Sequence, residues 1–188
     1  FVCRNPRYAT PVRQAFQRYV AVSCDIPRVF DTGIPVVLEL PTKNWVCFFL
    51  ARTLGNMNDR DAAGMLLAVL KDSRPEAASG RPDPLGPGVL FLHNDLTPCW
   101  RAAVIWSLGR LGDLRAVSQL LDIVDNLDNA TDTRHAAAVA LTRLADAAAL
   151  PRLQRLVENY PEISVRRALR EACAACEREG MVLWRAGE

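Results

Sequence analysis

Lysine and histidine are nearly absent from this sequence, and their scarcity excludes several kinds of chemistry. Lys43 and Lys71 are the only lysines among the 188 residues, and two histidines occur. One of them, His135, lies early in an alanine-rich helical segment, where a surface or helix-contact role is expected. The other, His93, has no orienting partner nearby in the sequence. A Ser–His–Asp or Cys–His catalytic group would need one of them as its base, so no catalytic residues are predicted.

Long apolar runs are also missing. Arg, Asp or Pro interrupts each of them well before the roughly 18 residues that a membrane-spanning helix needs, so no transmembrane segment is predicted. No glycine-rich phosphate loop of standard spacing occurs. The formal net charge is only +2, and the charges are mixed along the chain. A nucleic-acid-binding protein would need a basic stripe, so no nucleic-acid partner is expected.

The cysteines do not form a disulfide framework. Six are scattered over the chain, at a density below that of small secreted disulfide proteins. We therefore expect reduced thiols and a cytoplasmic location. Cys173 and Cys176 form a lone CxxC without a second pair or a nearby histidine, so no zinc site and no cofactor are predicted. Their register in the repeat described next places both in the core, as small hydrophobic residues.

The sequence repeats itself. A shift of 33 places Arg101 on Arg134, Leu108 on Leu141 and Asp113 on Asp146, and the apolar positions continue to match beyond these residues. A further shift of 32 carries Arg134 to Arg166. In the other direction, a shift of 54 brings Leu54-Gly55 to Leu108-Gly109 and Asp59 to Asp113, so one unit is longer by about 21 residues. A period of this length is typical of stacked helical repeats.

Each unit contains two amphipathic helices. The second helix keeps apolar residues at helical spacing, as in Val117, Leu120, Leu121 and Val124. Thr97-Pro98 and Thr10-Pro11 predict helix starts, with threonine as N-cap and proline at the first helical position. The aspartates Asp59, Asp113 and Asp146 are expected to cap the turn into the second helix. Gly180 is a candidate helix stop, followed by the apolar segment Met181 to Trp184.

The segment from Arg101 through Asp113 (RAAVIWSLGRLGD) resembles the HEAT-like repeat first named from phycobilisome lyases. The resemblance covers roughly Asn44 to Glu179 and, more distantly, Thr10 to Leu40, with Asp31 to Leu40 as the second helix of a divergent first unit. It implies an all-α fold, a right-handed α-solenoid of about five helical hairpins in a single domain spanning residues 1–188. The expected units span residues 10–42, 44–73, 98–127, 131–159 and 162–179, with an insertion at 74–97.

Enzymes with related architectures require residues that are absent here. Deoxyhypusine hydroxylase resembles this chain in fold and holds iron with paired His–Glu steps, whereas His93 and His135 are followed by Asn and Ala. The DNA glycosylases that resemble HEAT arrays bind a duplex along a basic face, which the mixed charges here do not provide. What the HEAT-like resemblance implies instead is a long surface for a protein partner. A bilin lyase-like role in chromophore handling is the alternative, and it has no short catalytic motif to check.

A candidate interaction surface follows from the helical register. Residues of the second helices that are not needed for the core should face away from it, on the concave side. The candidate partner-binding residues are Arg115, Gln119, Asp122, Arg152 and Arg155, with Phe91 and His93 of the Pro- and Gly-rich insertion beside them. Arg110 and Arg143 fall on the opposite, outer face.

The sequence therefore predicts a non-enzymatic scaffold. Because it starts at Phe1 without an initiator methionine, it is interpreted as a piece of something longer, such as the tail domain of a larger bacterial protein. The expected partner is another protein or another domain of the parent chain.

Overall fold

The computed structural model describes residues 5–21, 42–72 and 100–186. Within these residues the regular structure is helical and no strand is present. The α-helices are α1 (Ala9–Ala21), α2 (Thr42–Met57), α3 (Ala62–Asp72), α4 (Trp100–Leu111), α5 (Val117–Asp125), α6 (Thr131–Leu144), α7 (Leu150–Asn159) and α8 (Ile163–Ala186). Three short 3-10 helices accompany them: η1 (Pro6–Tyr8), η2 (Leu114–Ala116) and η3 (Ala147–Ala149). The helix expected at Asp31 to Leu40, the helix start at Thr97-Pro98 and the insertion at 74–97 lie outside the described residues.

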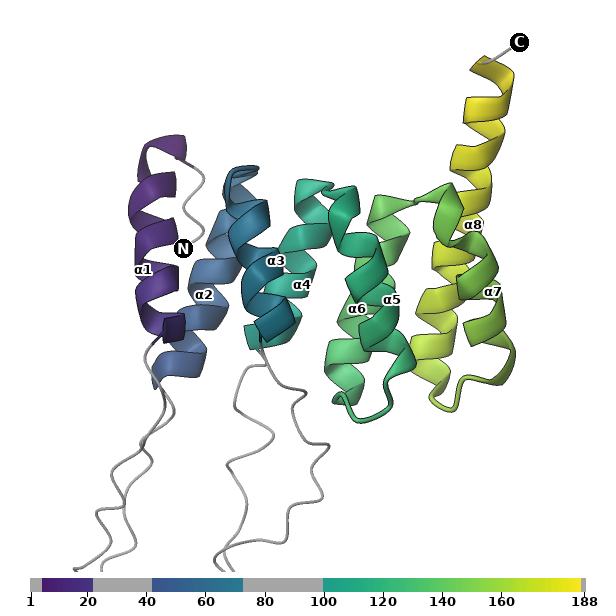
Figure 1. The fold of residues 1–188 in the computed structure, drawn as a ribbon, viewed down its shortest axis with the longest axis horizontal. Coiled ribbons are helices and arrows are strands. Elements are labelled where there is room, and N and C mark those ends of the chain that lie inside the picture. Colours follow the sequence, from purple (N-terminus) through teal and green to yellow (C-terminus); the bar gives the residue numbers. More distant parts are fainter. Residues whose placement is uncertain (1–4, 22–41, 73–99, 187–188) are drawn as a thin grey trace, which may run out of the picture.

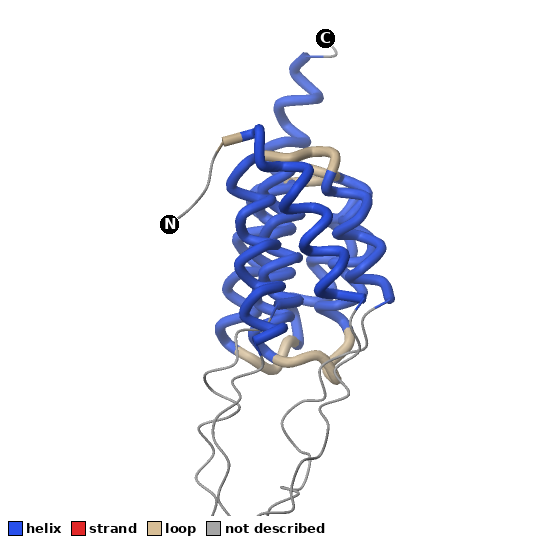
Figure 2. Tube along the Cα trace, turned by 90° about the vertical axis from the view of Figure 1, so that its left-hand side faces the viewer, coloured by secondary structure: helices blue, strands red, loops and turns tan. Residues whose placement is uncertain are grey.

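The helices form two layers that run side by side along the long axis of the array (Figure 1). The first layer contains α1, α2, α4, α6 and α8, each packed against the next. The second layer contains α3, α5 and α7, which pack against α4, α6 and α8 respectively. An end-on view separates the two layers (Figure 2). Each second-layer helix thus covers the first-layer helix that follows it in the chain. This contact joins one helix pair to the next.

The first-layer helices approach one another closely because small residues lie between them. A Cβ atom added at Gly55 would lie 2.9 Å from the Cα of Ser107, and one added at Gly109 would lie 2.9 Å from the Cα of Ala140. The Ser107 hydroxyl lies 2.7 Å from the carbonyl oxygen of Ala51 on the neighbouring helix. The backbones of α2, α4 and α6 are therefore nearly in contact, as the alanine- and glycine-rich sequence of these helices allows.

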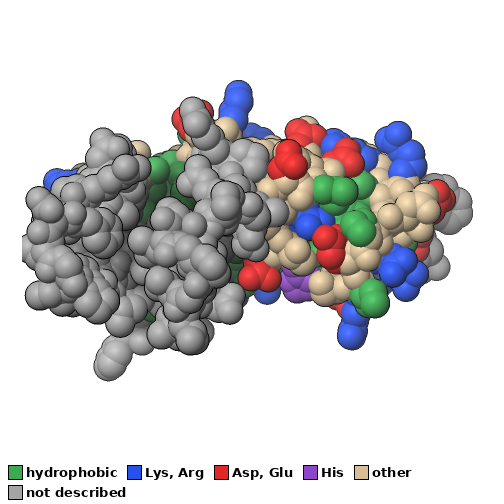
Figure 3. All heavy atoms as spheres, turned by 90° about the horizontal axis from the view of Figure 1, so that it is seen from below, with side chains coloured by type: hydrophobic (Ala, Val, Ile, Leu, Met, Phe, Trp, Pro, Cys, Tyr) green, Lys and Arg blue, Asp and Glu red, His purple; other side chains and the backbone are tan. Residues whose placement is uncertain are grey.

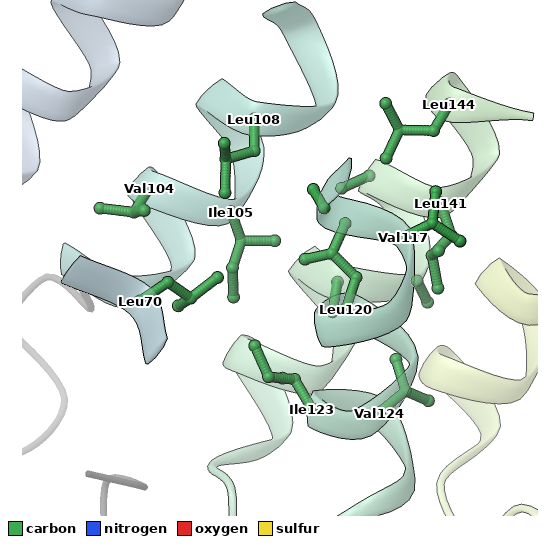
Figure 4. Close-up of a cluster of buried hydrophobic side chains, with 14 of the residues drawn as sticks. Leu70, Val104, Ile105, Leu108, Val117, Leu120, Ile123, Val124, Leu141 and Leu144 are labelled. Carbon is green, nitrogen blue, oxygen red and sulfur yellow. The ribbon is translucent and has the colours of Figure 1, made fainter. Parts of the chain in front are cut away.

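The core lies between the two layers. Leu54, Leu108 and Leu141, expected at equivalent positions, are at most 2% exposed, which confirms the register. Side chains from α3, α4, α5 and α6 meet in this core (Figure 4). Each fully buried leucine contributes on the order of 1.5–3 kcal/mol of transfer free energy. The apolar stripe at Val117, Leu120, Leu121 and Val124 is buried as predicted.

The turns between paired helices share a backbone conformation that the sequence pattern did not reveal. Asn58, Gly112 and Ala145 have φ angles of 55°, 70° and 47°, and each directly precedes one of the recurring aspartates. Left-handed geometry suits glycine and asparagine and costs roughly 1 kcal/mol for alanine. The same one-residue reversal thus recurs at every described turn of this kind.

Two of the three recurring aspartates act as predicted. Asp113 accepts a hydrogen bond from the backbone N–H of Arg115, and Asp146 accepts one from that of Ala148, both at 3.0 Å. The expectation for Asp59 is wrong. Its carboxylate accepts a hydrogen bond from Arg13 of α1 at 2.8 Å, and its other oxygen is buried without a hydrogen-bond partner. Asp59 is therefore used to attach α1, because an arginine is within reach there.

Two predicted helix ends also differ from the structure. α1 begins at Ala9, directly after η1, so Thr10 lies inside the helix and is not its N-cap. Its hydroxyl accepts a hydrogen bond from Arg13 at 3.1 Å. Gly180 does not end α8, which continues to Ala186. A glycine inside a helix costs only about 1 kcal/mol, so it ends a helix only where the following chain needs to turn.

Recurring arginines connect successive units near the N-terminal ends of α4 and α6, at the bottom of the view in Figure 1. Arg101 donates a hydrogen bond to the side-chain oxygen of Asn129, 28 residues later, at 2.9 Å. Arg134 likewise reaches the carboxylate of Glu162, 28 residues later, with two bonds of 2.8 and 2.6 Å. Asn129 and Glu162 are themselves one repeat apart. Each arginine thus joins the start of its own first-layer helix to a residue one or two positions before the next first-layer helix.

The Arg134 site is a small buried network. Arg134 is 4% exposed, and it also donates to the backbone oxygen of Asn129 and to the Tyr160 hydroxyl. Tyr160 in turn donates to the carbonyl oxygen of Val124 at 2.5 Å. The hydrogen bonds from Arg134 lower the pKa of Glu162 below its ordinary value of 4.5. The network therefore satisfies an otherwise costly buried charge while it joins two loops.

Replacing Gly109 by alanine should destabilise the protein by about 1–3 kcal/mol, because the new methyl group meets the backbone of α6 and the two helices must separate. The matched control is Gly64→Ala on α3, where an added Cβ meets nothing within 4 Å. There alanine should stabilise the helix by about 0.5–1 kcal/mol. Urea unfolding measures both, and equal shifts in the same direction would contradict the packing described here.

Arg134→Ala should lower the free energy of unfolding at pH 7 by about 2 kcal/mol, since a charged hydrogen-bond network is lost. The loss should also depend on pH. The pKa of Glu162 is depressed in the folded state, so its contribution is complete above the ordinary value of 4.5 and disappears as the pH falls through the folded-state pKa. The difference between the variant and the original protein should shrink over that range.

The control for this experiment is Arg167→Ala. Arg167 makes an exposed ion pair with Glu171 on the same helix, for which a loss of about 0.5 kcal/mol or less is expected. Chemical denaturation at a series of pH values gives both curves. A gap between Arg134→Ala and the original protein that stays constant down to strongly acidic pH would show that the Glu162 pair does not contribute as described.

Candidate functional site

The predicted partner-binding residues of the second helices lie on the second layer, and most of them form ion pairs within the protein. Arg152 bridges Asp122 at 2.8 Å and Asp125 at 3.1 Å, which links α7 to α5. Arg115 pairs with Asp113 at 2.6 Å within its own turn, and this hydrogen bond lowers the pKa of the Asp113 carboxyl group. The structure therefore brings Asp122 and Arg152 together and leaves Arg115 in a separate pair.

The remaining predicted site residues make fewer contacts. Arg155 is exposed and donates only a 3.4 Å hydrogen bond to the carbonyl oxygen of Pro151 on its own helix. Gln119 is partly buried. Phe91 and His93 lie outside the described residues. Of the predicted row, Arg155 is thus the exposed cation without an ion pair.

A different group of side chains, which we name the Arg–Trp cluster, lies on the first layer. Trp106 of α4 is surrounded by three guanidinium groups from three helices. The carbon atom Cζ lies 3.7 Å from the ring centroid for Arg52 of α2, 5.1 Å for Arg110 of α4, and 5.5 Å for Arg143 of α6. Arg52 also lies 5.9 Å from the ring centroid of Phe48. These distances are those of cation–π contacts.

The cluster concentrates positive charge. None of its three arginines forms an ion pair with a described carboxylate. Burial, and then the charges of Arg143 and Arg110, lower the pKa of Arg52. Two features offset the repulsion. The negative face of the Trp106 ring attracts each cation, and Arg110 and Arg143 lie in the last turns of α4 and α6, where the helix dipole favours positive charge.

Arg110 shows how the cluster is held in place. Its Nε atom donates a 3.3 Å hydrogen bond to the carbonyl oxygen of Gly55, in the last turn of α2. The close approach of α2 and α4 at Gly55 makes this reach possible. The same closeness on the other side lets Arg143 of α6 reach the ring on α4. The cluster is therefore a product of first-layer packing.

Sequence reasoning missed this site. The 33-residue shift that relates Arg110 to Arg143 was visible, as was a tryptophan on the outer face of α4. What the repeat did not show is that Arg52, the residue equivalent to Trp106 in the preceding unit, extends over the ring. The signal in the sequence is an aromatic residue with arginines at or near the equivalent positions of the neighbouring units, as Trp106 has in Arg52 and Arg143.

The C-terminal end of the described array contains an open hollow of about 440 Å³ between α7 and α8. Cys173 lies on its wall and is partly buried, so the prediction of a fully buried thiol is wrong for this residue. Cys176 is 0% exposed, as predicted. Burial raises the pKa of both thiols. Cys173 differs from Leu108 and Leu141 because no further described helix pair covers α8.

Within residues 5–21, 42–72 and 100–186, no three potential metal ligands among His, Cys, Asp and Glu come together. No helix there combines the length and apolar character needed to cross a bilayer. Seen from below, the described surface mixes acidic, basic and apolar side chains (Figure 3). The described part of that end therefore has no continuous field of one sign.

The two layers and the repeated helix pairs define the described chain as an all-helical repeat protein. A family model for HEAT repeats matches residues 89–174. The match supports a HEAT-like repeat protein, in agreement with the resemblance of Arg101 to Asp113. Comparison with curated proteins gives no match.

The two cysteines of α8 should differ in reactivity. Cys173 should react with N-ethylmaleimide faster than Cys176, because only Cys173 reaches the surface. Its rate should rise with pH above neutrality, since the thiolate is the reactive form and its pKa is raised. Peptide mapping by mass spectrometry distinguishes the two sites, and buried Cys47 is the internal control. Equal labelling of Cys173 and Cys176 in the native protein would contradict the burial described here.

Proposed function

We propose that this protein is a non-enzymatic scaffold for protein–protein interaction, built as a right-handed solenoid of about five HEAT-like hairpins. Its partner is another protein or another domain of the parent chain. HEAT repeats are commonly protein-interaction scaffolds, and the family match is the observation that carries the proposal. The described helices add support, since they present side chains at regular intervals along both layers.

The proposed working surface is the second-layer row at Arg115, Gln119, Asp122, Arg152 and Arg155, extended by Phe91 and His93. Within its described part, Asp122 and Arg155 are exposed and Gln119 is partly buried. Arg152 is held between Asp122 and Asp125, so its guanidinium is oriented before a partner arrives. A preorganised arginine loses less conformational freedom on binding than a mobile one.

Bilin handling, the activity of the phycobilisome lyases, receives no specific support. The open hollow beside Cys173 is lined by Gln154, Glu158, Arg170 and Glu177 among others. A pocket that buries most of a large chromophore would be more enclosed than this hollow. A shift in the absorbance of added bilin on mixing with the purified protein would nevertheless favour that activity over the scaffold.

The scaffold proposal is tested with a directly binding partner. Such a protein is first captured by affinity purification, and the binary complex is then rebuilt from purified components. Arg152→Glu combined with Arg155→Glu should weaken this complex at least tenfold by isothermal titration calorimetry, because two interface arginines are reversed in charge. Circular dichroism checks that the variant remains helical.

The control pair is Arg167→Glu with Arg170→Glu, two exposed positions on α8 in the first layer that carry the same change of charge. It should bind as the original protein does. If the α8 pair abolishes binding and the second-layer pair does not, the surface has been assigned to the wrong layer. If no partner forms a binary complex at all, the scaffold function itself is wrong.

A further inference from the structure

We propose that the Arg–Trp cluster of Arg52, Trp106, Arg110 and Arg143 binds an acidic segment of a partner polypeptide, at a site separate from the second-layer row. This inference rests on the proposed scaffold function, because the ligand is taken to be a protein. It also adds to that function a defined site and a defined chemistry. The evidence is the convergence of three guanidinium groups on one ring without a carboxylate partner.

The cluster differs from the ion-paired arginines of the described structure: Arg13 pairs with Asp59 and Asp61, and Arg134 pairs with Glu162. Other described arginines also lack an ion pair, and the cluster is distinct because three of them converge on one ring. The three cluster arginines contact an aromatic ring instead, which attracts a cation by only about 0.5–1 kcal/mol at an exposed site.

A bound carboxylate would relieve the repulsion between the cluster arginines. Arg143 and Arg110 are exposed, so their N–H groups remain accessible to a ligand. A guanidinium presents two parallel N–H groups that match a carboxylate, and such charge-assisted bonds are roughly twice as strong as neutral ones. Among the described residues, the cluster guanidinium groups make one hydrogen bond, from Nε of Arg110 to the carbonyl oxygen of Gly55. Their other N–H groups are therefore available to a carboxylate.

The number of charges favours a polypeptide over a nucleic acid. A protein that binds DNA through its backbone commonly neutralises 6–10 phosphates. The cluster supplies three positive charges, and the chain as a whole has a formal net charge of only +2. Two or three acidic side chains match the cluster more closely than a continuous phosphate backbone does.

Apolar surface next to the cluster specifies the ligand further. Phe49 is 58% exposed and precedes Arg52 by three residues, which places both on the same side of α2. Its ring meets that of Phe48 edge to face, with centroids 5.5 Å apart. Tryptophan, arginine and aromatic residues together are typical of interface hot spots. The ligand is thus an acidic segment that also carries apolar side chains.

The test uses a fluorescein-labelled short peptide of glutamate, aspartate and leucine, with binding measured by fluorescence anisotropy. Arg143→Gln should weaken binding about tenfold, equivalent to about 1.4 kcal/mol. Arg143 is the best position because it is exposed and its only described interaction of this kind is with Trp106. Arg143→Lys, which keeps the charge, should retain part of the affinity. Raising the salt concentration from about 50 to about 200 mM should weaken binding.

The matched control is Arg178→Gln, an exposed arginine of α8 without an ion pair to a described residue, where the same charge is removed outside both proposed surfaces. The affinity of this variant for the peptide should be unchanged. Equal weakening by Arg178→Gln and Arg143→Gln would show diffuse attraction and overturn the proposal. So would the absence of peptide binding, or tighter binding of a single-stranded oligonucleotide or inorganic polyphosphate than of the peptide. If the peptide fails while a protein partner still binds the second-layer row, the scaffold function stands and only the cluster assignment is wrong.

Discussion

The close approach of the first-layer helices is the constraint on which most of the structure depends. With no room for a Cβ atom at Gly55 or Gly109, the backbones of α2, α4 and α6 are nearly in contact. This spacing determines where the second layer can pack, since α5 covers α6 and α7 covers α8. It also sets the surface, because side chains from three helices can meet at one ring only if those helices are close.

Two further interactions keep this spacing regular along the array. At one end of the helices, a left-handed residue followed by aspartate reverses the chain at each described turn. At the other end, Arg101 and Arg134 each join their helix to a loop 28 residues later. The buried arginine network costs desolvation free energy, and its full set of hydrogen bonds offsets that cost. The turns therefore fix the two helices within a unit, and the arginines fix one unit to the next.

How much the sequence predicts depends on whether a residue acts within the repeat or between units. The positions of Leu54, Leu108 and Leu141 follow from periodicity alone, because helical spacing and a 33-residue shift both specify a buried site. The capping role of Asp113 was predictable for the same reason. Asp59 was not, since its partner Arg13 comes from α1 in the divergent first unit, which none of the sequence shifts aligns with the others.

The candidate sites show the same division. Arg152 was correctly placed on the second layer, but its pairing with Asp122 and Asp125 depends on the distance between α5 and α7, which the period does not give. The Arg–Trp cluster was missed because it combines three units, while the repeat comparison treats one position at a time. The partial exposure of Cys173 likewise reflects the end of the described array, where the local pattern looks the same as in its middle.

The Arg–Trp cluster also has a mechanical consequence. Its members lie on α2, α4 and α6, so it spans two consecutive first-layer interfaces. Bending the array at either interface moves one guanidinium relative to the ring of Trp106. A ligand that holds all three arginines would resist both movements at once. Occupancy of the cluster by such a ligand would therefore be coupled to the bending of this part of the array, and the cluster would act as a clamp on that bending.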